Sequence, residues 1–351
     1  MVHPAASASV SPAMPSGLRY VSDATPGITR HKKGEGFVFH HADGTLVKKG
    51  PDLDRITHLA IPPAYVDVWI CPKANGHLQA TGRDARGRKQ YLYHPAWRTA
   101  RDETKFDRML AFGAALPKLR ARVTRDLSTA KGPHIERATV MAAVVRLLDT
   151  TMVRVGNDEY ARSNQSFGLT TLRKRHVAVN GDHLRLRFKG KSGVAHDVAL
   201  KDKRIARVVK GCQSLPGQEL FKYLDADGQA HSVDSSDVND YLRDASGGDF
   251  TAKDFRTWHG SAAALGLFKA LGDDERAVIT KTLANRLVTE VAQLLGNTAA
   301  VCRKSYIHPQ VMALLMNTAV LAAPRPTAVA RRRAGLTVSD AAFLAFLKRL
   351  K

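Results

Sequence analysis

Five polar residues between positions 154 and 306 have side chains that could bind and attack a phosphodiester. They are Arg154, Lys191, Arg256, Asn297 and Tyr306. Fixed arginines and a neutral amide can stabilise the charge of a pentacoordinate phosphorus. A tyrosine oxygen can be the nucleophile if its surroundings favour ionisation, since its ordinary pKa is about 10, and a flexible lysine can protonate the departing sugar oxygen. These residue types are therefore suited to phosphoryl transfer.

Each of these residues also has an ordinary structural role open to it. Arg154 could be a cation at a helix C-terminus, Lys191 a solvated turn residue, and Arg256 one arm of an ion pair. Asn297 could cap a helix, and Tyr306 could pack in a core. Composition and periodicity cannot bring the five into one site, so both interpretations stay open at this point.

The elements around these residues are predicted from apolar spacing and from turn signals. A helix over about residues 133–152 precedes Arg154, and "DHLRLRFKGKSGVAHDVAL" predicts a β-hairpin with Lys191 at its tip. Helices dominate from residue 235, and Thr251 begins a capping box that places Arg256 in the first turns of one of them. Backbone N–H groups at such a helix start favour anions.

The N-terminal region, from residue 18 to about residue 105, is predicted as strands and turns. Within it, "GRDARGRKQYLYH" combines cations for phosphates with side chains that can reach base edges or sugars. The alternative for this stretch is a solvated basic turn followed by a half-buried strand. The candidate DNA-contact residues are Arg86, Arg88, Lys89, Gln90, Tyr91 and Tyr93.

The charge balance indicates a polyanionic partner. The 54 Lys and Arg residues against 32 Asp and Glu give a formal net charge of +22, and nucleic acid is the leading candidate. No apolar run approaches the length of a membrane span, and three scattered cysteines have neither metal-ligand spacing nor a disulfide pattern. We expect a cytoplasmic protein, associated with the nucleoid if the polyanion is the chromosome.

A family resemblance unites the five residues. The segments "VRVGNDEYARSNQSFGLTTLRKRHV", "RFKGKSGVAHDV", "KDFRTWHGS" and "LLGNTAAVCRKSYIHP" resemble the catalytic domain of type IB DNA topoisomerases, in their compact bacterial and poxvirus branch. Upstream, "LAIPPAYVDVWI" and "TGRDARGRKQYLYH" resemble the N-terminal β domain of that branch. The resemblance covers about residues 18–315, and the ordered set of motifs makes it specific.

The resemblance implies a role for each of the five. Arg154 and Arg256 match the arginines that clamp the scissile phosphate, and Lys191 matches the acid that protonates the leaving 5′-oxygen. Tyr306 matches the nucleophile that forms a 3′-phosphotyrosyl link. Asn297 stands where many relatives have histidine, so it can donate a hydrogen bond but carries no charge.

Further residues are implied to contact DNA or to lie near the phosphate. Tyr160 and Lys253 fall on DNA-contact positions of the family, as do Gln90, Tyr91 and Tyr93. His259, three residues after Arg256 on a similar helical face, is a possible phosphate contact, although a packed helix histidine is the more ordinary role.

The expected fold class is α+β. A disordered leader (1–17) precedes a mainly antiparallel β domain (18–110), a mainly α catalytic domain with a small β-hairpin sheet (111–323) and a basic C-terminal tail (324–351). The resemblance implies a monomer that clamps around double-stranded DNA, relaxes positive and negative supercoils, and needs neither nucleotide, metal nor other cofactor. A tyrosine recombinase is the alternative enzyme, but Lys253 stands where recombinases commonly have histidine. A non-catalytic DNA-binding protein is the other alternative.

Overall fold

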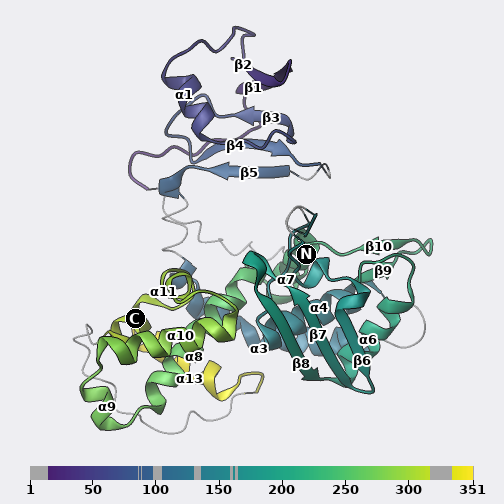
Figure 1. Ribbon diagram of the computed structural model, residues 1–351, viewed down its shortest axis with the longest axis vertical. Helices are drawn as coiled ribbons and strands as arrows, with labels where there is room; N and C mark the ends of the chain where they lie inside the picture. Colours follow the sequence, from purple (N-terminus) through teal and green to yellow (C-terminus); the bar gives the residue numbers. More distant parts are fainter. Residues whose placement is uncertain are drawn as a thin grey trace, which may run out of the picture. The chain divides into compact units, whose positions relative to one another are not determined.

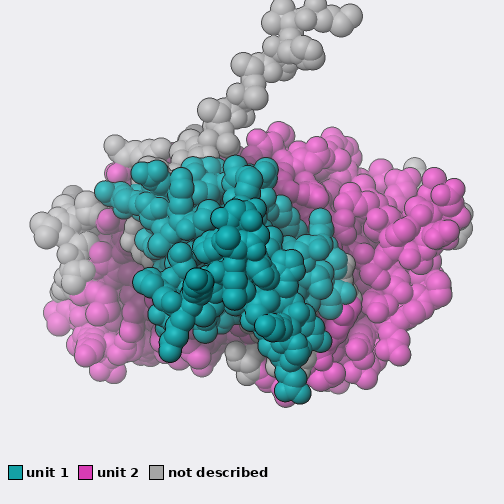
Figure 2. All heavy atoms as spheres, turned by 90° about the horizontal axis from the view of Figure 1, so that it is seen from above, with its two compact units in different colours: residues 1–105 teal, residues 106–351 magenta. Residues whose placement is uncertain are grey.

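The computed structural model describes residues 15–85, 87, 89–97, 105–129, 136–158, 161–162, 165–316 and 334–350. The chain divides into two compact units, Met1–Lys105 and Phe106–Lys351, which Figure 2 colours separately. The division lies five residues before the boundary predicted at 110/111. The limits of the predicted leader and domains remain predictions.

The N-terminal unit is built on a five-stranded antiparallel sheet with the order β2-β1-β3-β4-β5 (Figure 1). Ile28, Ile70 and Ala80 are fully buried in its core, and Ile56 of a short helix, α1, joins them. The elements are β1 (Ile28–Lys33), β2 (Gly36–His40), α1 (Pro51–His58), β3 (Val66–Ile70), β4 (Leu78–Arg83) and β5 (Lys89–Tyr93).

The second unit is mainly helical, which confirms the predicted fold class (Figure 1). Its helices include α3 (Met109–Ser128), α4 (Arg137–Thr151), α6 (Lys203–Ser214), α7 (Ser235–Ser246), α8 (Ala252–Ala270), α9 (Asp273–Ala277), α10 (Lys281–Leu295), α11 (Ala299–Ser305), α12 (Pro309–Leu315) and α13 (Val338–Arg349). Within the described ranges, no helix is long and apolar enough to cross a bilayer.

Two helices, α4 and α8, form the centre of this unit. Most residues of α4 are buried because α3, α6, α7 and α8 all pack against it. Helix α8 packs against α3, α4, α7, α10, α12 and α13, and its Phe255 and Trp258 are almost fully buried. Surrounded helices are apolar on all sides, which explains why neither sequence has one clearly polar face.

The predicted hairpin sheet is also present. Strands β6 (Val177–Asn180), β7 (His183–Lys189) and β8 (Ala195–Lys201) pair antiparallel in that order. Leu184, Leu186 and Phe188 point into the core, as their alternation predicted, and α6 packs against β6 and β7. The 3-10 turn η3 (Lys191–Gly193) joins β7 to β8.

The C-terminal segment differs from the basic tail expected there. Its residues 338–349 form α13, in which Phe343 is fully buried, and the helix packs against α8 and α3. Asp340, only 1% exposed, accepts hydrogen bonds from Trp258 (2.6 Å) and from Arg120 of α3 (2.7 Å). The apolar face of this segment therefore belongs to the core of the helical unit, whereas its basic residues had suggested a tail.

Candidate active site

Arg256 is the centre around which the other residues gather. It lies on α8 and is only 4% exposed. Its guanidinium donates hydrogen bonds to the carbonyls of Met152 and Leu295, the latter at 2.7 Å. Met152 caps α4 in a left-handed conformation and Leu295 is the last residue of α10, so Arg256 supplies a cation to the C-terminal ends of two helices.

The same two helix ends deliver two further candidates. Arg154 follows Met152 by two residues, and Asn297 follows Leu295 by two. One guanidinium nitrogen of Arg154 donates to Asn297 Oδ1, and another lies 3.4 Å from the carbonyl oxygen of Gly296. Asn297 therefore uses its oxygen internally. Its buried Nδ2 has no hydrogen-bond partner among the described residues, which leaves a donor at the site.

Tyr306 lies directly against Arg256. It caps the end of α11, and the guanidinium carbon of Arg256 is 5.0 Å from the centre of its ring. Burial alone would raise the pKa of the Tyr306 phenol, but Arg256, Arg154 and Lys253 together hold this pKa below its ordinary value. A lowered pKa makes the phenol oxygen a better nucleophile near neutral pH.

The backbone at Tyr306 is held by a small, buried part of α8. Ser261, which is fully buried, accepts from the backbone N–H of His308 (2.9 Å), and its single hydroxyl proton is shared between the carbonyls of Thr257 (2.8 Å) and Tyr306 (3.1 Å). Its neighbour Gly260 lies so close that a Cβ there would be 2.7 Å from the Tyr306 carbonyl oxygen. A glycine and a serine of α8 thus fix the position of the candidate nucleophile.

Lys191 lies on the exposed turn between β7 and β8, flanked by Gly190 and Gly193. Gly193 has a φ of +77°, a conformation that favours glycine. The turn is closed by a hydrogen bond of 2.7 Å from Gly190 N–H to the carbonyl of Val194. Four candidates, Arg154, Arg256, Asn297 and Tyr306, meet at the helix ends, while Lys191 comes from this separate hairpin.

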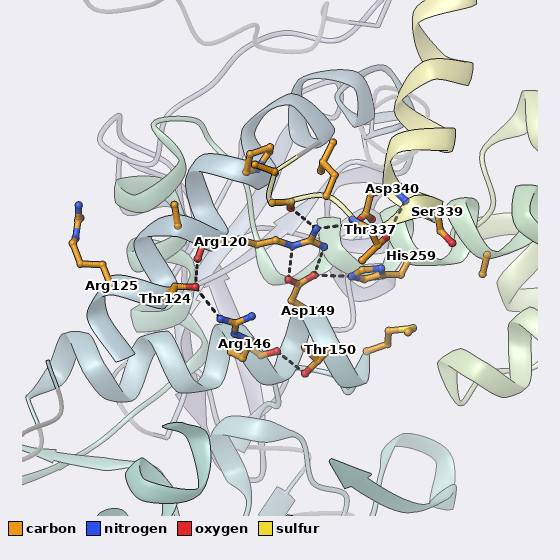
Figure 3. Close-up of a pocket in the computed structure, with 18 of the residues that line it drawn as sticks. Arg120, Thr124, Arg125, Arg146, Asp149, Thr150, His259, Thr337, Ser339 and Asp340 are labelled. Carbon is orange, nitrogen blue, oxygen red and sulfur yellow. Dashed lines mark hydrogen bonds and ion pairs between the residues drawn. The ribbon is translucent and has the colours of Figure 1, made fainter. Parts of the chain in front are cut away.

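His259 faces a different set of groups. Its Nε2 is 2.9 Å from Asp149 Oδ1, and Arg120 binds both oxygens of the same carboxylate (2.7 and 2.9 Å; Figure 3). Burial would raise the pKa of Asp149, but His259 and Arg120 outweigh burial and hold that pKa well below its usual range. These residues line a cavity of about 1270 Å³ between α3, α4, α8 and the start of α13, so His259 links helices of the core.

Four of the candidate DNA-contact residues of the N-terminal unit, Lys89, Gln90, Tyr91 and Tyr93, lie on β5. Lys89 pairs with Asp23 (2.5 Å) and Gln90 donates to Asp84 (2.9 Å). The rings of Tyr91 and Tyr93 stack with centres 6.1 Å apart, and Tyr91 is half exposed. Arg86, Arg88 and Tyr160 lie outside the described residues.

Sequence reasoning missed the residues that support this cluster. It did not find the carbonyls that hold Arg256, the contacts of Gly260 and Ser261, or His196 of β8, whose pKa is lowered by burial and by Arg154 and Arg256. All of these contacts join residues far apart along the chain. The possible helix cap at Asn297 was visible in the sequence, but the groups that contact this helix end were not.

Comparison with known proteins gives matches along most of the chain. A family model described as "Eukaryotic DNA topoisomerase I, catalytic core" matches residues 94–323, and one described as "Bacterial DNA topoisomerase IB, N-terminal domain" matches residues 36–84. DNA topoisomerase 1B of Acanthamoeba polyphaga mimivirus is 32% identical over 299 residues, which cover 83% of this chain and 88% of the relative. DNA topoisomerase 1B of Vaccinia virus (strain Copenhagen) is 24% identical over 205 residues, covering 55% and 63%.

These matches favour the topoisomerase over both alternatives, the recombinase and the non-catalytic DNA-binding protein. They agree with the architecture, in which an antiparallel sheet precedes a helical unit that carries a small sheet. The chain belongs to the family of type IB DNA topoisomerases, enzymes that act on DNA.

Proposed function

We propose that the chain relaxes positively and negatively supercoiled DNA through a transient covalent link between Tyr306 and one DNA strand. The observation that supports this most strongly is the packing of Arg256 against the Tyr306 ring, at 5.0 Å, with Arg154 and Asn297 at the adjoining helix ends. A phenol can supply the nucleophile for an in-line attack on a phosphodiester, and two guanidinium groups can stabilise the negative charge that develops on its oxygens.

In the proposed cleavage step, Tyr306 Oη forms a bond to phosphorus and the bond from phosphorus to the 5′-oxygen breaks. The phenol proton leaves to solvent, and Lys191 gives a proton to the departing 5′-oxygen. Arg154, Arg256 and the Nδ2 donor of Asn297 stabilise the negative charge on the nonbridging oxygens. The 3′ end stays esterified to Tyr306 while the free 5′ end rotates.

Resealing is the reverse of cleavage. The 5′-hydroxyl oxygen forms a bond to phosphorus and gives its proton to Lys191, while the bond from phosphorus to Tyr306 Oη breaks and the phenolate takes a proton from solvent. The number of phosphoester bonds is unchanged throughout, so we expect no requirement for ATP. The two arginines provide the positive charge at the phosphate, so we expect activity without added metal. We further propose that one chain is sufficient and that both units bind the duplex.

Plasmid relaxation in the presence of a chelator and without ATP tests this proposal. The wild-type chain should relax both signs of supercoil and leave a protein–DNA adduct on Tyr306 when the reaction is stopped with detergent. Tyr306→Phe should abolish relaxation and the adduct but bind DNA nearly as well, because only the attacking oxygen is lost. A strict need for ATP or a metal ion, or an adduct on another tyrosine such as Tyr91, would refute the mechanism.

A further inference from the structure

His196 lies at the junction between the hairpin that carries Lys191 and the helical body. It is on β8, five residues after Lys191, and it pairs across the sheet with Phe188 of β7. The two rings stack with centres 4.8 Å apart and planes 8° from parallel. Phe188 is buried, so this stacking fixes the imidazole to the base of the hairpin turn.

Two glycines make the space that the imidazole occupies. A Cβ on Gly190 would lie 2.6 Å from its Cδ2 and Nε2, and a Cβ on Gly296 would lie 2.8 Å from its Cε1. Real Cβ atoms do not approach other atoms so closely, so the ring fits only because both positions lack a side chain. Gly190 precedes Lys191 and Gly296 precedes Asn297, so a single ring touches the neighbours of two candidate catalytic residues.

The charge of the surroundings suits a neutral ring. Burial lowers the pKa of His196 below its usual 6.5, and the nearby cations Arg154 and Arg256 lower it further. A neutral imidazole can lie beside two guanidinium groups without repulsion, whereas a lysine or arginine side chain there would repel them. Among the described residues no hydrogen bond to the imidazole is found, which leaves packing as its observed interaction.

We propose that His196 is a positioning residue that docks the Lys191 hairpin onto the turn formed by Gly296 and Asn297. The ring fills the space between Gly190 of the hairpin and Gly296 at the end of α10. It thereby holds the hairpin turn where Lys191 can reach the leaving 5′-oxygen. This inference rests on the role proposed above for Lys191 as the proton donor.

Single-turnover cleavage of two DNA substrates tests the proposal. One has the ordinary 5′-oxygen at the scissile bond and the other has sulfur in its place, which leaves readily without a proton. His196→Ala should slow cleavage of the ordinary substrate by up to about 10²-fold, which a misplacement of about 1 Å can cost. The same variant should cleave the sulfur substrate at close to the wild-type rate, because Lys191 is not needed there.

Two further variants separate packing from other roles. His196→Phe keeps a flat ring that can stack on Phe188, so it should recover most of the rate that His196→Ala loses. Gly190→Ala keeps the imidazole but pushes it from the hairpin side, at a backbone conformation that any residue can adopt (φ −91°), so it should show the same defect and the same rescue by sulfur. Gly190→Ala also provides the test if His196→Ala does not fold.

Three outcomes would overturn the inference. Equal defects of His196→Ala on both substrates would place its effect outside the proton-transfer step. Recovery with His196→Gln but not with His196→Phe would make His196 a hydrogen-bond donor. A normal rate for Gly190→Ala would show that this packing of the ring is not needed. Lys191→Ala is the reference variant. If the sulfur substrate does not restore its cleavage rate, Lys191 is not the proton donor, and the proposed role of His196 falls with it.

Discussion

Replacing Gly260 by alanine should displace Tyr306, the proposed nucleophile, without damaging the rest of the site. Gly260 lies on α8, one turn after Arg256, and it faces the backbone of Tyr306. A Cβ on residue 260 would lie 2.7 Å from the carbonyl oxygen of Tyr306, 3.2 Å from the Cβ of Tyr306 and 3.1 Å from Leu295 Cδ1. Because ordinary contacts begin at 3.4 Å, the carbonyl must retreat by 0.7 Å.

The structure sets the size of the two expected effects. Overpacking a tight core costs about 1–3 kcal/mol, and alanine in place of glycine in a helix returns about 1 kcal/mol. The net loss of unfolding free energy should therefore be about 0–2 kcal/mol, which leaves the protein folded. A retreat of 0.7 Å moves the phenol relative to Arg256, and a misplacement of about 1 Å costs up to 10²-fold in rate. We expect cleavage to slow by about 10- to 10²-fold.

Single-turnover formation of the covalent adduct measures the rate of cleavage, and urea denaturation measures the free energy of unfolding. Gly266→Ala is the matched control, because Gly266 is on the same helix and a Cβ there would have no neighbour within 4 Å. The control should cleave at the wild-type rate and gain about 1 kcal/mol of stability. A wild-type cleavage rate for Gly260→Ala, or an equal loss of rate in the control, would refute the reasoning.

Two further predictions concern the groups that surround the site. Ser261→Ala leaves the buried N–H of His308 without its acceptor and removes the hydroxyl proton shared by the carbonyls of Thr257 and Tyr306, so it should cost about 1–3 kcal/mol of unfolding free energy in urea and slow adduct formation; no change in either would show that the hydroxyl is not needed. Asp149→Asn removes one partner of a buried pair with Arg120 and should cost about 3 kcal/mol at neutral pH. Because the folded-state pKa of Asp149 is depressed, its contribution is present above the unfolded value of about 4 and is lost as the pH falls below it. Wild type should therefore lose more stability on acidification than Asp149→Asn, and parallel curves of stability against pH would contradict this.

The sequence was most informative where contacts are local. Alternation of Leu184, Leu186 and Phe188 predicted β7 and its buried face, and the capping box at Thr251 predicted the start of α8. Residue types suggested phosphoryl transfer, and the family resemblance selected which arginine and which tyrosine to consider. The signals for β7 and α8 depend on residues a few positions apart, whereas the resemblance depends on an ordered set of motifs along the chain.

What the sequence did not predict depends on contacts across the fold. Arg256 is held by carbonyls of Met152 and Leu295, which lie 104 and 39 positions away. Every residue has a backbone carbonyl, so residue types do not show which carbonyls will accept these hydrogen bonds. The position of His196 could not be predicted either, because its ring packs against Gly190 and Gly296, which lie next to other candidate residues. Nothing local in the sequence of α13 indicated that α8 and α3 would cover its apolar face.

The packing of α13 has a consequence for the order in which the enzyme matures during synthesis. Chains emerge from the ribosome N-terminus first, so Arg256 and Tyr306 are made before residues 338–349. Until that segment arrives, the indole N–H of Trp258 lacks its acceptor Asp340 and the α8 surface that Phe343 covers is open to water. Helix α8 carries Arg256, Gly260 and Ser261, so its final packing comes late. A nascent chain would thus carry the residues proposed to cut DNA before the packed core that holds them in position is complete.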